Sequence, residues 1–141
     1  MPEIFEYQRR VEFRDTDMAG IVHFSVFFAY MEEAEHAMLR SLGTNVHADV
    51  DGQKISWPRV RATCDYRRPL RYDDLFTVAV QVISIGEKSI TYGFVVTRES
   101  ELIAEGSITA VCCVVKHDAP PQSIQIPESF RKIFAVDNQQ A

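Results

Sequence analysis

Two aspartates stand directly before the segment with the clearest helical pattern in the chain. They are Asp15 and Asp17, in the stretch FRDTDMAGIVHF of residues 13–24. A carboxylate can attack an acyl carbonyl or activate a water molecule. The unpaired N–H groups at the start of a helix can stabilise the oxyanion that develops on that carbonyl. The order of these residues therefore permits acyl transfer at the beginning of a helix.

A thioester is the acyl compound that suits such a sparse site. Its thiolate is stable enough to leave without a strong general acid, whereas an amide would need a protonated group for which the sequence has no obvious candidate. The competing interpretation is structural, because aspartates are common in turns and favour the positive end of a helix dipole. Local chemistry alone leaves both interpretations open.

The segment after the aspartates predicts a helix over residues 25–42. Its apolar residues recur at spacings of three and four, which is typical of a helix that buries one side. These residues are Phe27, Tyr30, Met31, Ala34, Met38 and Leu42. Ser25 is placed to begin the helix as its N-cap, and Gly43 is placed to end it. The stripe includes small alanines, so we expect the helix to lie close against a sheet.

Five further segments have the composition of β-strands. They are residues 7–14, 59–67, 75–84, 89–98 and 102–115. Tight joints around Gly86 and Ser100 separate the last three and are typical of antiparallel hairpins. A short helix over residues 127–134 is expected near the end of the chain. This order predicts an α+β domain, in which a five-stranded, mostly antiparallel sheet wraps around one long helix.

The strand expected over residues 59–67 alternates strictly, which predicts that one set of its side chains faces the core. That set is Val60, Ala62, Cys64 and Tyr66. The other two cysteines, Cys112 and Cys113, are adjacent in an apolar strand segment. Three cysteines without a C-x-x-C spacing favour buried free thiols in a reducing compartment over a nucleophile or a metal ligand.

Composition and charge exclude several classes of protein. The 141 residues fit one domain, which we expect to span residues 1–141. The formal net charge of −5 argues against general nucleic-acid binding. No apolar run reaches the roughly 18 residues that a membrane span needs. The N-terminal residues lack an apolar signal segment, so we expect a cytoplasmic protein that is not bound to a membrane.

Residues 13–39 resemble the signature of the hotdog-fold acyl-CoA thioesterases of the 4-hydroxybenzoyl-CoA thioesterase and YbgC type. The family pattern is an aromatic residue, then x-D-x-D-x-x-G-x-V, then an aromatic or histidine pair and a long helix. The residues that fit it are Phe13, Asp15, Thr16, Asp17, Gly20, Val22, His23 and Phe24. The stretch DYRRPLRYDDLFTV also resembles the family's second strand and the start of its third. The resemblance covers residues 7–134 and implies the hotdog fold, with the sheet wrapped around one central helix.

The resemblance also implies a role for each residue of the motif. Asp17, the second aspartate of D-x-D, is the expected catalytic carboxylate, either as a nucleophile or as a general base. The backbone N–H of Phe24 is the expected oxyanion donor, and Gly20 allows a tight turn near the thioester. His23 is a further catalytic candidate, which could contact the thioester or orient the carboxylate. Asp15 is expected to hold the loop together.

The substrate implied by the resemblance is an acyl-CoA, which is hydrolysed to the free acid and CoA. Phe27 is a candidate contact for the acyl group, whose aromatic or aliphatic nature stays open. Arg67 and Lys88 are candidates for binding the CoA phosphates. We expect no cofactor and no metal, because a Glu–His spacing such as that of Glu33 and His36 on a helix is more typical of a solvated ion pair. The family forms homodimers, often paired into homotetramers, with active sites between subunits, so the expected partner is a second copy of the chain.

Three alternatives remain open at this point. Glu32 could be the catalytic carboxylate instead, because some hotdog thioesterases use a glutamate on the helix. A hotdog acyl dehydratase would use His23 and leave Asp17 unexplained. A non-catalytic hotdog module that binds acyl-CoA would keep the pocket and need no carboxylate, since one fold hosts several functions.

Overall fold

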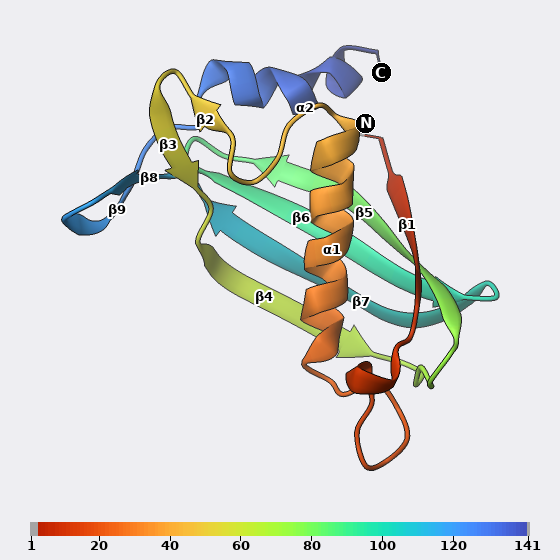
Figure 1. Ribbon diagram of the computed structural model, residues 1–141. Coiled ribbons are helices and arrows are strands. Elements are labelled where there is room, and N and C mark those ends of the chain that lie inside the picture. Colours follow the sequence, from red (N-terminus) through yellow and green to blue (C-terminus); the bar gives the residue numbers. More distant parts are fainter. Residues whose placement is uncertain (1–2, 141) are drawn as a thin grey trace.

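A long helix, α1, lies across one face of a five-stranded sheet (Figure 1). The computed structural model describes residues 3–140, with side chains as far as residue 134. The strands of the sheet are β1 (Phe5–Arg10), β4 (Arg59–Tyr66), β5 (Leu75–Ile85), β6 (Ser89–Arg98) and β7 (Glu101–Val111). Their order is β1-β5-β6-β7-β4, and all neighbouring pairs are antiparallel. The predicted five-stranded sheet around one helix is confirmed.

Helix α1 spans Val26–Ser41, close to the predicted range. Its buried residues are Phe27, Tyr30, Met31, Ala34, Glu35, Met38 and Leu39. Gly43 follows the helix with a φ of 84°, a conformation that glycine adopts without strain. The sheet comes close to the helix at Gly106, where an added Cβ would lie 2.7 Å from the Met31 Cε. The expected close packing of helix and sheet is therefore present.

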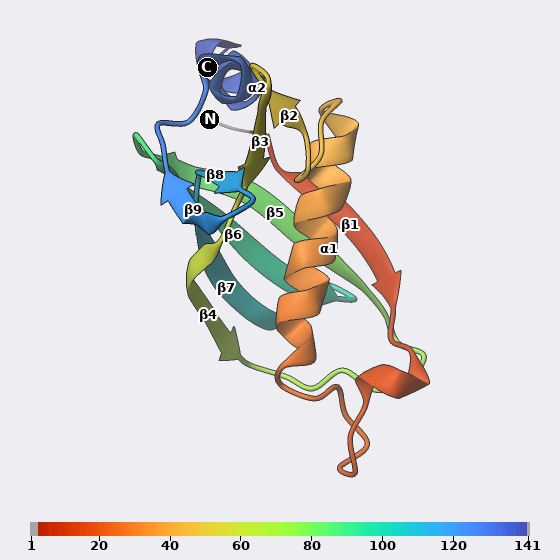
Figure 2. The same cartoon turned by 60° about the vertical axis from the view of Figure 1, so that its left-hand side comes forward.

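A second, smaller sheet lies beside the C-terminal end of α1, as Figure 2 shows. Its strands are β2 (Asp49–Val50), β3 (Gln53–Ser56), β8 (Cys113–Lys116) and β9 (Ala119–Ser123). The sequence pattern did not predict this sheet, and the single strand expected over residues 102–115 is divided at Cys112 into β7 and β8. Helix α2 (Glu128–Gln140) begins near its predicted start. Its Phe130 ring lies 4.8 Å from the ring of Trp57.

Strand β4 forms one edge of the main sheet. The prediction that its alternating side chains face the core is wrong for Val60, Ala62 and Tyr66, which are exposed. Only Cys64 of that set is partly buried against the core. The register shifts beside Val60, and no other element of the described chain pairs with the free edge of β4. One chain therefore leaves apolar side chains uncovered at a sheet edge.

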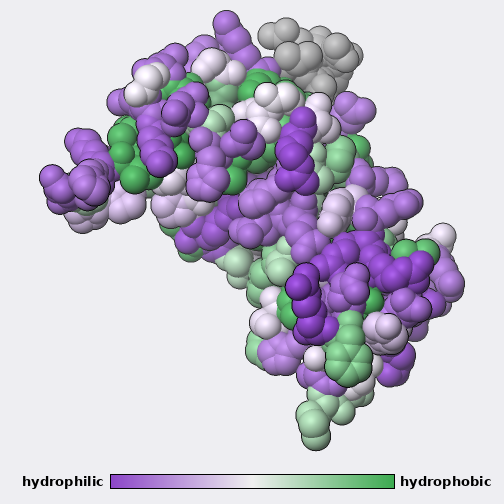
Figure 3. Space-filling model, in the orientation of Figure 1, coloured by the Kyte–Doolittle hydropathy of each residue, from purple (hydrophilic) through white to green (hydrophobic). Residues whose placement is uncertain are grey.

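The segment between β1 and α1 forms the lower end of the molecule in Figure 1. Strand β1 ends before the predicted limit, because Phe13–Asp15 form a short 3₁₀ helix, η1. The loop that follows is closed by a bridge between Thr16 and Val22, and Met18 near its tip is fully exposed. Figure 3 shows apolar residues at this lower end, below a largely hydrophilic face. The predicted site residues near the helix start thus lie on a projecting loop.

Candidate active site

Asp15 anchors the loop before α1. Its side chain is buried, and its Oδ2 accepts hydrogen bonds from the Tyr30 hydroxyl at 2.8 Å, from Arg9 Nη1 at 2.9 Å and from the Glu12 N–H at 2.9 Å. Its backbone carbonyl accepts the His23 N–H at 2.9 Å. Burial opposes ionisation of Asp15, but the hydrogen bonds and the Arg9 charge hold its pKa below the usual value. These contacts fit the expected role of Asp15 in holding the loop.

Replacing Asp15 by asparagine should lower the free energy of unfolding by about 1–3 kcal/mol at pH 7. The reason is that Arg9 and the Tyr30 hydroxyl lose an ionised acceptor in a buried position. The folded-state pKa of Asp15 lies below its unfolded value of about 3.9, so its ionisation stabilises the fold above that pH. This contribution is lost as the pH falls through the folded-state pKa.

Urea unfolding of the wild type and of Asp15→Asn at several pH values measures this difference. The difference in the free energy of unfolding between the two proteins should be largest at neutral pH and shrink below about pH 4. Asp118→Asn is the matched control, because Asp118 is exposed between β8 and β9. A gap of the same size at every pH would contradict the role assigned to the ionised Asp15.

Asp17 begins the turn of the projecting loop. Its N–H donates to the Ile21 carbonyl at 3.0 Å, and its carbonyl accepts the Gly20 N–H at 2.9 Å. Gly20 has a φ of 79°, which the tight turn requires and glycine supplies. The Asp17 Oδ1 accepts the Ala19 N–H at 2.8 Å, whereas its Oδ2 has no hydrogen-bond partner in the described part of the chain. One carboxylate oxygen is thus oriented by the backbone and the other is available for chemistry.

The backbone at the start of α1 presents an unused N–H, that of Phe24. The carbonyl of His23, in the same peptide unit, accepts the Val26 N–H at 2.9 Å. The Ser25 N–H donates to the His23 Nδ1 at 3.3 Å. Among residues 3–134, no acceptor contacts the Phe24 N–H. A free N–H at the positive end of a helix can stabilise an oxyanion.

A cavity of about 510 Å³ brings Asp17 and Phe24 together. Its lining comes from the projecting loop, the start of α1 and the segment after β4. The lining residues are Asp17, Ile21, Val22, Phe24, Phe27, Tyr66, Arg67, Arg68 and Pro69. The predicted site residues Asp17, Phe24, Phe27 and Arg67 are among them. A carboxylate and a helix start therefore face one space that is large enough for an acyl group.

Aromatic side chains form one wall of this cavity. The rings of Phe27 and Tyr66 lie 5.3 Å apart at 85°, an edge-to-face contact. The Tyr66 hydroxyl donates to the Phe24 carbonyl at 2.8 Å. Burial, together with the neighbouring Cys64 thiol, raises the pKa of Tyr66 to about 12. The alternating pattern assigned Tyr66 to the core, so its place in the site was missed. The only signal was its position in the stretch DYRRPL.

Two arginines border the cavity, and both are paired with glutamates of β7. Arg67 Nη2 lies 3.0 Å from the Glu105 Oε1, and Arg68 Nε lies 3.2 Å from the Glu101 Oε2. All four side chains are well exposed. Exposed ion pairs of this kind contribute little to stability, so the arginines can exchange these partners for an anionic ligand. Arg67 is one of the two basic residues predicted for the site, and its neighbour Arg68, also a basic candidate in the sequence, borders the same cavity.

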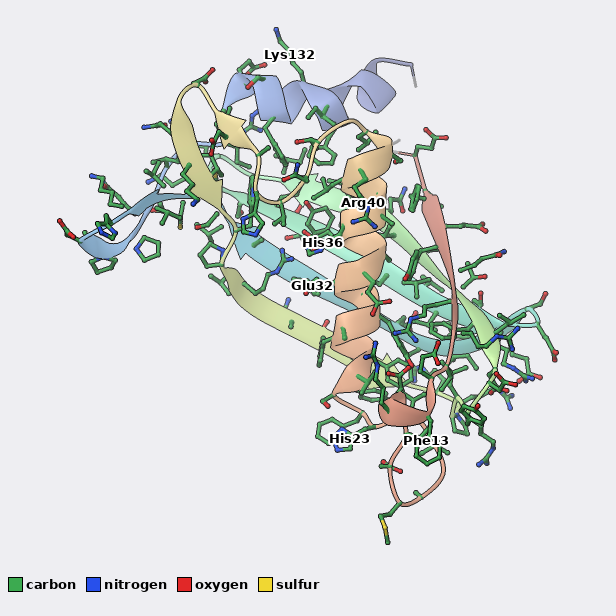
Figure 4. The ribbon with its side chains drawn as sticks, in the orientation of Figure 1. Phe13, His23, Glu32, His36, Arg40 and Lys132 are labelled. Atoms are coloured by element: carbon green, nitrogen blue, oxygen red, sulfur yellow. The ribbon has the colours of Figure 1, made fainter. Side chains whose placement is uncertain are left out.

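The remaining predicted site residues lie outside this cavity. Gly20 shapes the loop turn, and the His23 Nδ1 lies 2.8 Å from the Ser25 Oγ, with its ring beside that of Phe24. Figure 4 places His23 at the start of the helix and Glu32 further along it. Glu32 lies 3.7 Å from a guanidinium nitrogen of Arg59 and does not line the cavity.

Lys88 lies at the opposite end of the main sheet. It precedes β6, and its carbonyl accepts the Cys112 N–H at 2.7 Å. Tyr66, in contrast, pairs with Ala104 near the start of β7. The strand rise puts these two ends of β7 about 23 Å apart. One chain therefore does not bring Lys88 to the cavity.

The structure also bears on metal binding and on membrane insertion. Within the described residues, no group of three or more His, Cys, Asp or Glu side chains is arranged to hold a metal ion. Helices with the length and apolar character needed to cross a membrane are absent from this same part of the chain.

The fold and the cavity define the class of the hotdog-fold thioesterases, and comparison with known proteins agrees with this class. Residues 11–134 match the family described as the Thioesterase-like superfamily. This match covers most of the chain, so the protein belongs to that superfamily. The predicted family, the hotdog fold and the class of thioester hydrolase are confirmed.

Individual relatives extend over nearly the whole chain. A protein of Aquifex aeolicus that is named as an esterase is 34% identical over 130 residues, which cover 92% of this chain and 97% of that protein. The 1,4-dihydroxy-2-naphthoyl-CoA hydrolase of Nostoc punctiforme is 29% identical over 135 residues, 91% of this chain and 89% of that enzyme. The structure of a gentisyl-coenzyme A thioesterase is 31% identical, has a TM-score of 0.78 and covers 89% of this chain and 98% of its own.

Proposed function

We propose that this protein hydrolyses aryl-CoA thioesters, with Asp17 as the catalytic carboxylate and the Phe24 N–H as the oxyanion donor. The observation that carries this proposal is the single cavity lined by both residues. The free Oδ2 of Asp17 either attacks the thioester carbonyl or removes a proton from an attacking water. The Phe24 N–H stabilises the oxyanion as it forms. In the first route the CoA thiolate leaves behind a mixed anhydride of Asp17, which one water molecule then hydrolyses to the free acid and the Asp17 carboxylate. In the second route the attacking water has already added to the carbonyl, so departure of the thiolate gives the free acid directly, and the proton held by Asp17 passes to the thiolate or to solvent.

The aryl preference rests on the shape and chemistry of the cavity wall. Phe27 and Tyr66 meet edge to face, and Phe24 borders the same space. An aromatic acyl group can pack against such rings with a favourable geometry that an alkyl chain does not gain. Two relatives are named for hydroxylated aromatic CoA esters, the 1,4-dihydroxy-2-naphthoyl-CoA hydrolase and the gentisyl-coenzyme A thioesterase. Their names support the same substrate class for this chain.

The phosphates of CoA are assigned to Arg67 and Arg68. Both guanidinium groups border the cavity and are held only by exposed glutamates. Arginine binds phosphate through paired N–H donors, so a CoA phosphate can replace the glutamate in each solvated ion pair. Lys88 joins this site only if it comes from a second copy, because it lies at the far end of the sheet in its own chain.

The second copy is proposed to bind along the free edge of β4. Antiparallel pairing of β4 with its own copy about a two-fold axis would continue the sheet and cover the exposed side chains of Val60 and Tyr66. The two-fold axis would also bring the Lys88 end of one chain toward the cavity of the other. The site would then lie between subunits, as the resemblance implies.

The homotetramer and the cytoplasmic location are also proposals. The outer face of the sheet carries small or hydroxyl-bearing residues, including Ala79, Gly93 and Ser107, and is our candidate surface for pairing two dimers into a homotetramer. The cytoplasm is the proposed compartment, supported by three free cysteines, of which Cys112 and Cys113 are buried.

Free-thiol release by the wild-type protein tests this function. The substrates are hydroxylated benzoyl-CoA and naphthoyl-CoA esters, alkanoyl-CoA esters of several lengths, and the matching aryl-pantetheine esters that lack the CoA phosphates. We expect kcat/KM for an aryl-CoA to exceed that for alkanoyl-CoA at least about tenfold. The KM for the pantetheine ester should be higher than for the CoA ester. No thiol release from any ester would overturn the function, and equal rates would overturn the aryl preference.

A further inference from the structure

The hydroxyl of Tyr66 contacts the backbone next to the oxyanion donor. It donates to the carbonyl of Phe24 at 2.8 Å across 42 residues of sequence. We propose that Tyr66 is a positioning residue, whose hydroxyl holds Phe24 so that its N–H points into the cavity. This inference rests on the proposed function, because it concerns the same N–H group.

The Phe24 N–H belongs to the peptide unit between His23 and Phe24. The backbone is held firmly on the His23 side of this unit and less firmly on the Ser25 side. The His23 N–H donates to the Asp15 carbonyl at 2.9 Å, and the His23 carbonyl accepts the Val26 N–H at 2.9 Å. On the other side, the Ser25 N–H makes a longer contact of 3.3 Å with the His23 Nδ1. The Tyr66 hydroxyl therefore supplies the short bond that limits rotation beyond Phe24.

Phe24 lacks the other restraints that usually fix the start of a helix. Its side chain is 63% exposed, so packing of its ring against the core does not hold it. Ser25 occupies the N-cap position, but its side chain makes no capping hydrogen bond. Its hydroxyl lies 2.8 Å from the His23 Nδ1 instead. The Tyr66 hydroxyl donates to a carbonyl and so does not cap the helix N–H groups, but it restrains the segment that the missing cap leaves loose.

Tyr66 is itself well placed to be a rigid tether. It lies at the end of β4, where it pairs with Ala104 of the sheet. Its ring packs edge to face against Phe27, which is only 3% exposed. A tyrosine hydroxyl is protonated at neutral pH, so it can donate to the Phe24 carbonyl. The hydrogen bond from Tyr66 therefore fixes the start of α1 relative to the main sheet.

Loss of the tether should affect the transition state more than the bound substrate. An oxyanion donor is effective when it lies 2.7–3.1 Å from the oxygen that develops charge, and removal of such a donor costs about 100- to 1000-fold in kcat. Misorientation of a donor that is still present should cost less. Tyr66→Phe keeps the ring in the cavity wall, so we expect kcat to fall about tenfold with KM unchanged.

The kinetic experiment compares Tyr66→Phe with Tyr72→Phe on an aryl-CoA. Tyr72 is the matched control, because it is 57% exposed, its ring contacts Phe13, and its hydroxyl makes no hydrogen bond in the described part of the chain. A fall in kcat for Tyr66→Phe alone supports the proposal. An unchanged kcat, or a rise in KM without a fall in kcat, overturns it and leaves Tyr66 as a wall of the cavity only.

A second measurement does not depend on hydrolysis. In ¹⁵N relaxation of the free protein, the order parameter of the Phe24 N–H should fall in Tyr66→Phe from about 0.85 toward about 0.6, and remain unchanged in Tyr72→Phe. An equally ordered Phe24 N–H in Tyr66→Phe overturns the proposal, whatever the kinetics. Loss of order in a protein that hydrolyses no CoA ester supports the tether and identifies the proposed function as the part that failed.

Discussion

Asp17→Asn should reduce kcat/KM for an aryl-CoA at least ~100-fold, which corresponds to about 2.7 kcal/mol of transition-state stabilisation. An amide can neither attack the thioester carbonyl nor accept a proton from water at neutral pH. The loop should remain intact, because the side-chain carbonyl of asparagine can still accept the Ala19 N–H that Asp17 Oδ1 accepts. The thermal midpoint of unfolding is therefore expected to stay close to that of the wild type.

Thiol release and thermal unfolding, measured on the same preparations, check this prediction. Glu32→Gln is the matched control, since Glu32 is the other carboxylate that the family resemblance made a candidate. Its side chain is 55% exposed, pairs with Arg59 and lies outside the cavity. We expect Glu32→Gln to keep its activity within a few-fold. Loss of activity in Glu32→Gln with full activity in Asp17→Asn would move the catalytic role to the helix.

The fold was predictable wherever a periodic pattern of apolar residues was followed by a residue that ends a helix or strand. Helix α1 is the clearest case, because its apolar stripe ends at Gly43, whose φ is positive. Strand β7 was predicted to run on through residue 115, since no glycine or proline marks the break at Cys112. The hairpin of β2 and β3 turns at Asp51 and Gly52, both with positive φ. Strands β2 and β3 are too short to show the alternation of apolar and polar residues from which a strand is predicted.

The site was predictable to the extent that it is local in sequence. The order of the residues permitted a carboxylate beside a helix start, and the family resemblance then selected Asp17 and Phe24, which lie within one short loop and both line the cavity. Tyr66 reaches the same loop from a strand 42 residues away. Such a contact depends on how the sheet packs on the helix, which strand alternation alone does not define. Alternation also assigned Val60 and Tyr66 to a core that one chain does not cover.

Val60→Glu should separate the proposed dimer and reduce kcat/KM at least ~100-fold, because each cavity then lacks the residues of the second copy. Val60 is 62% exposed in one chain, so a charge there does not disturb the core of the subunit. Two copies of β4 that pair about a two-fold axis would each bring this glutamate into the interface. Buried, unpaired carboxylates oppose association strongly.

Ile83→Glu is the control for the same change in charge and size. Ile83 is 61% exposed, but it lies on the outer face of the sheet in β5, which β6 and β7 separate from β4. It borders the surface proposed for pairing two dimers, so its change can separate dimers from one another but not two copies joined along β4. Sedimentation velocity gives the molecular mass, circular dichroism the fold, and thiol release the activity. Val60→Glu is expected to sediment as a folded monomer of 16.1 kDa with little activity, whereas Ile83→Glu should remain at least a dimer and active. An active Val60→Glu monomer would mean that Asp17 and Phe24 of one chain suffice for the reaction. The exposed β4 edge would then need a different explanation.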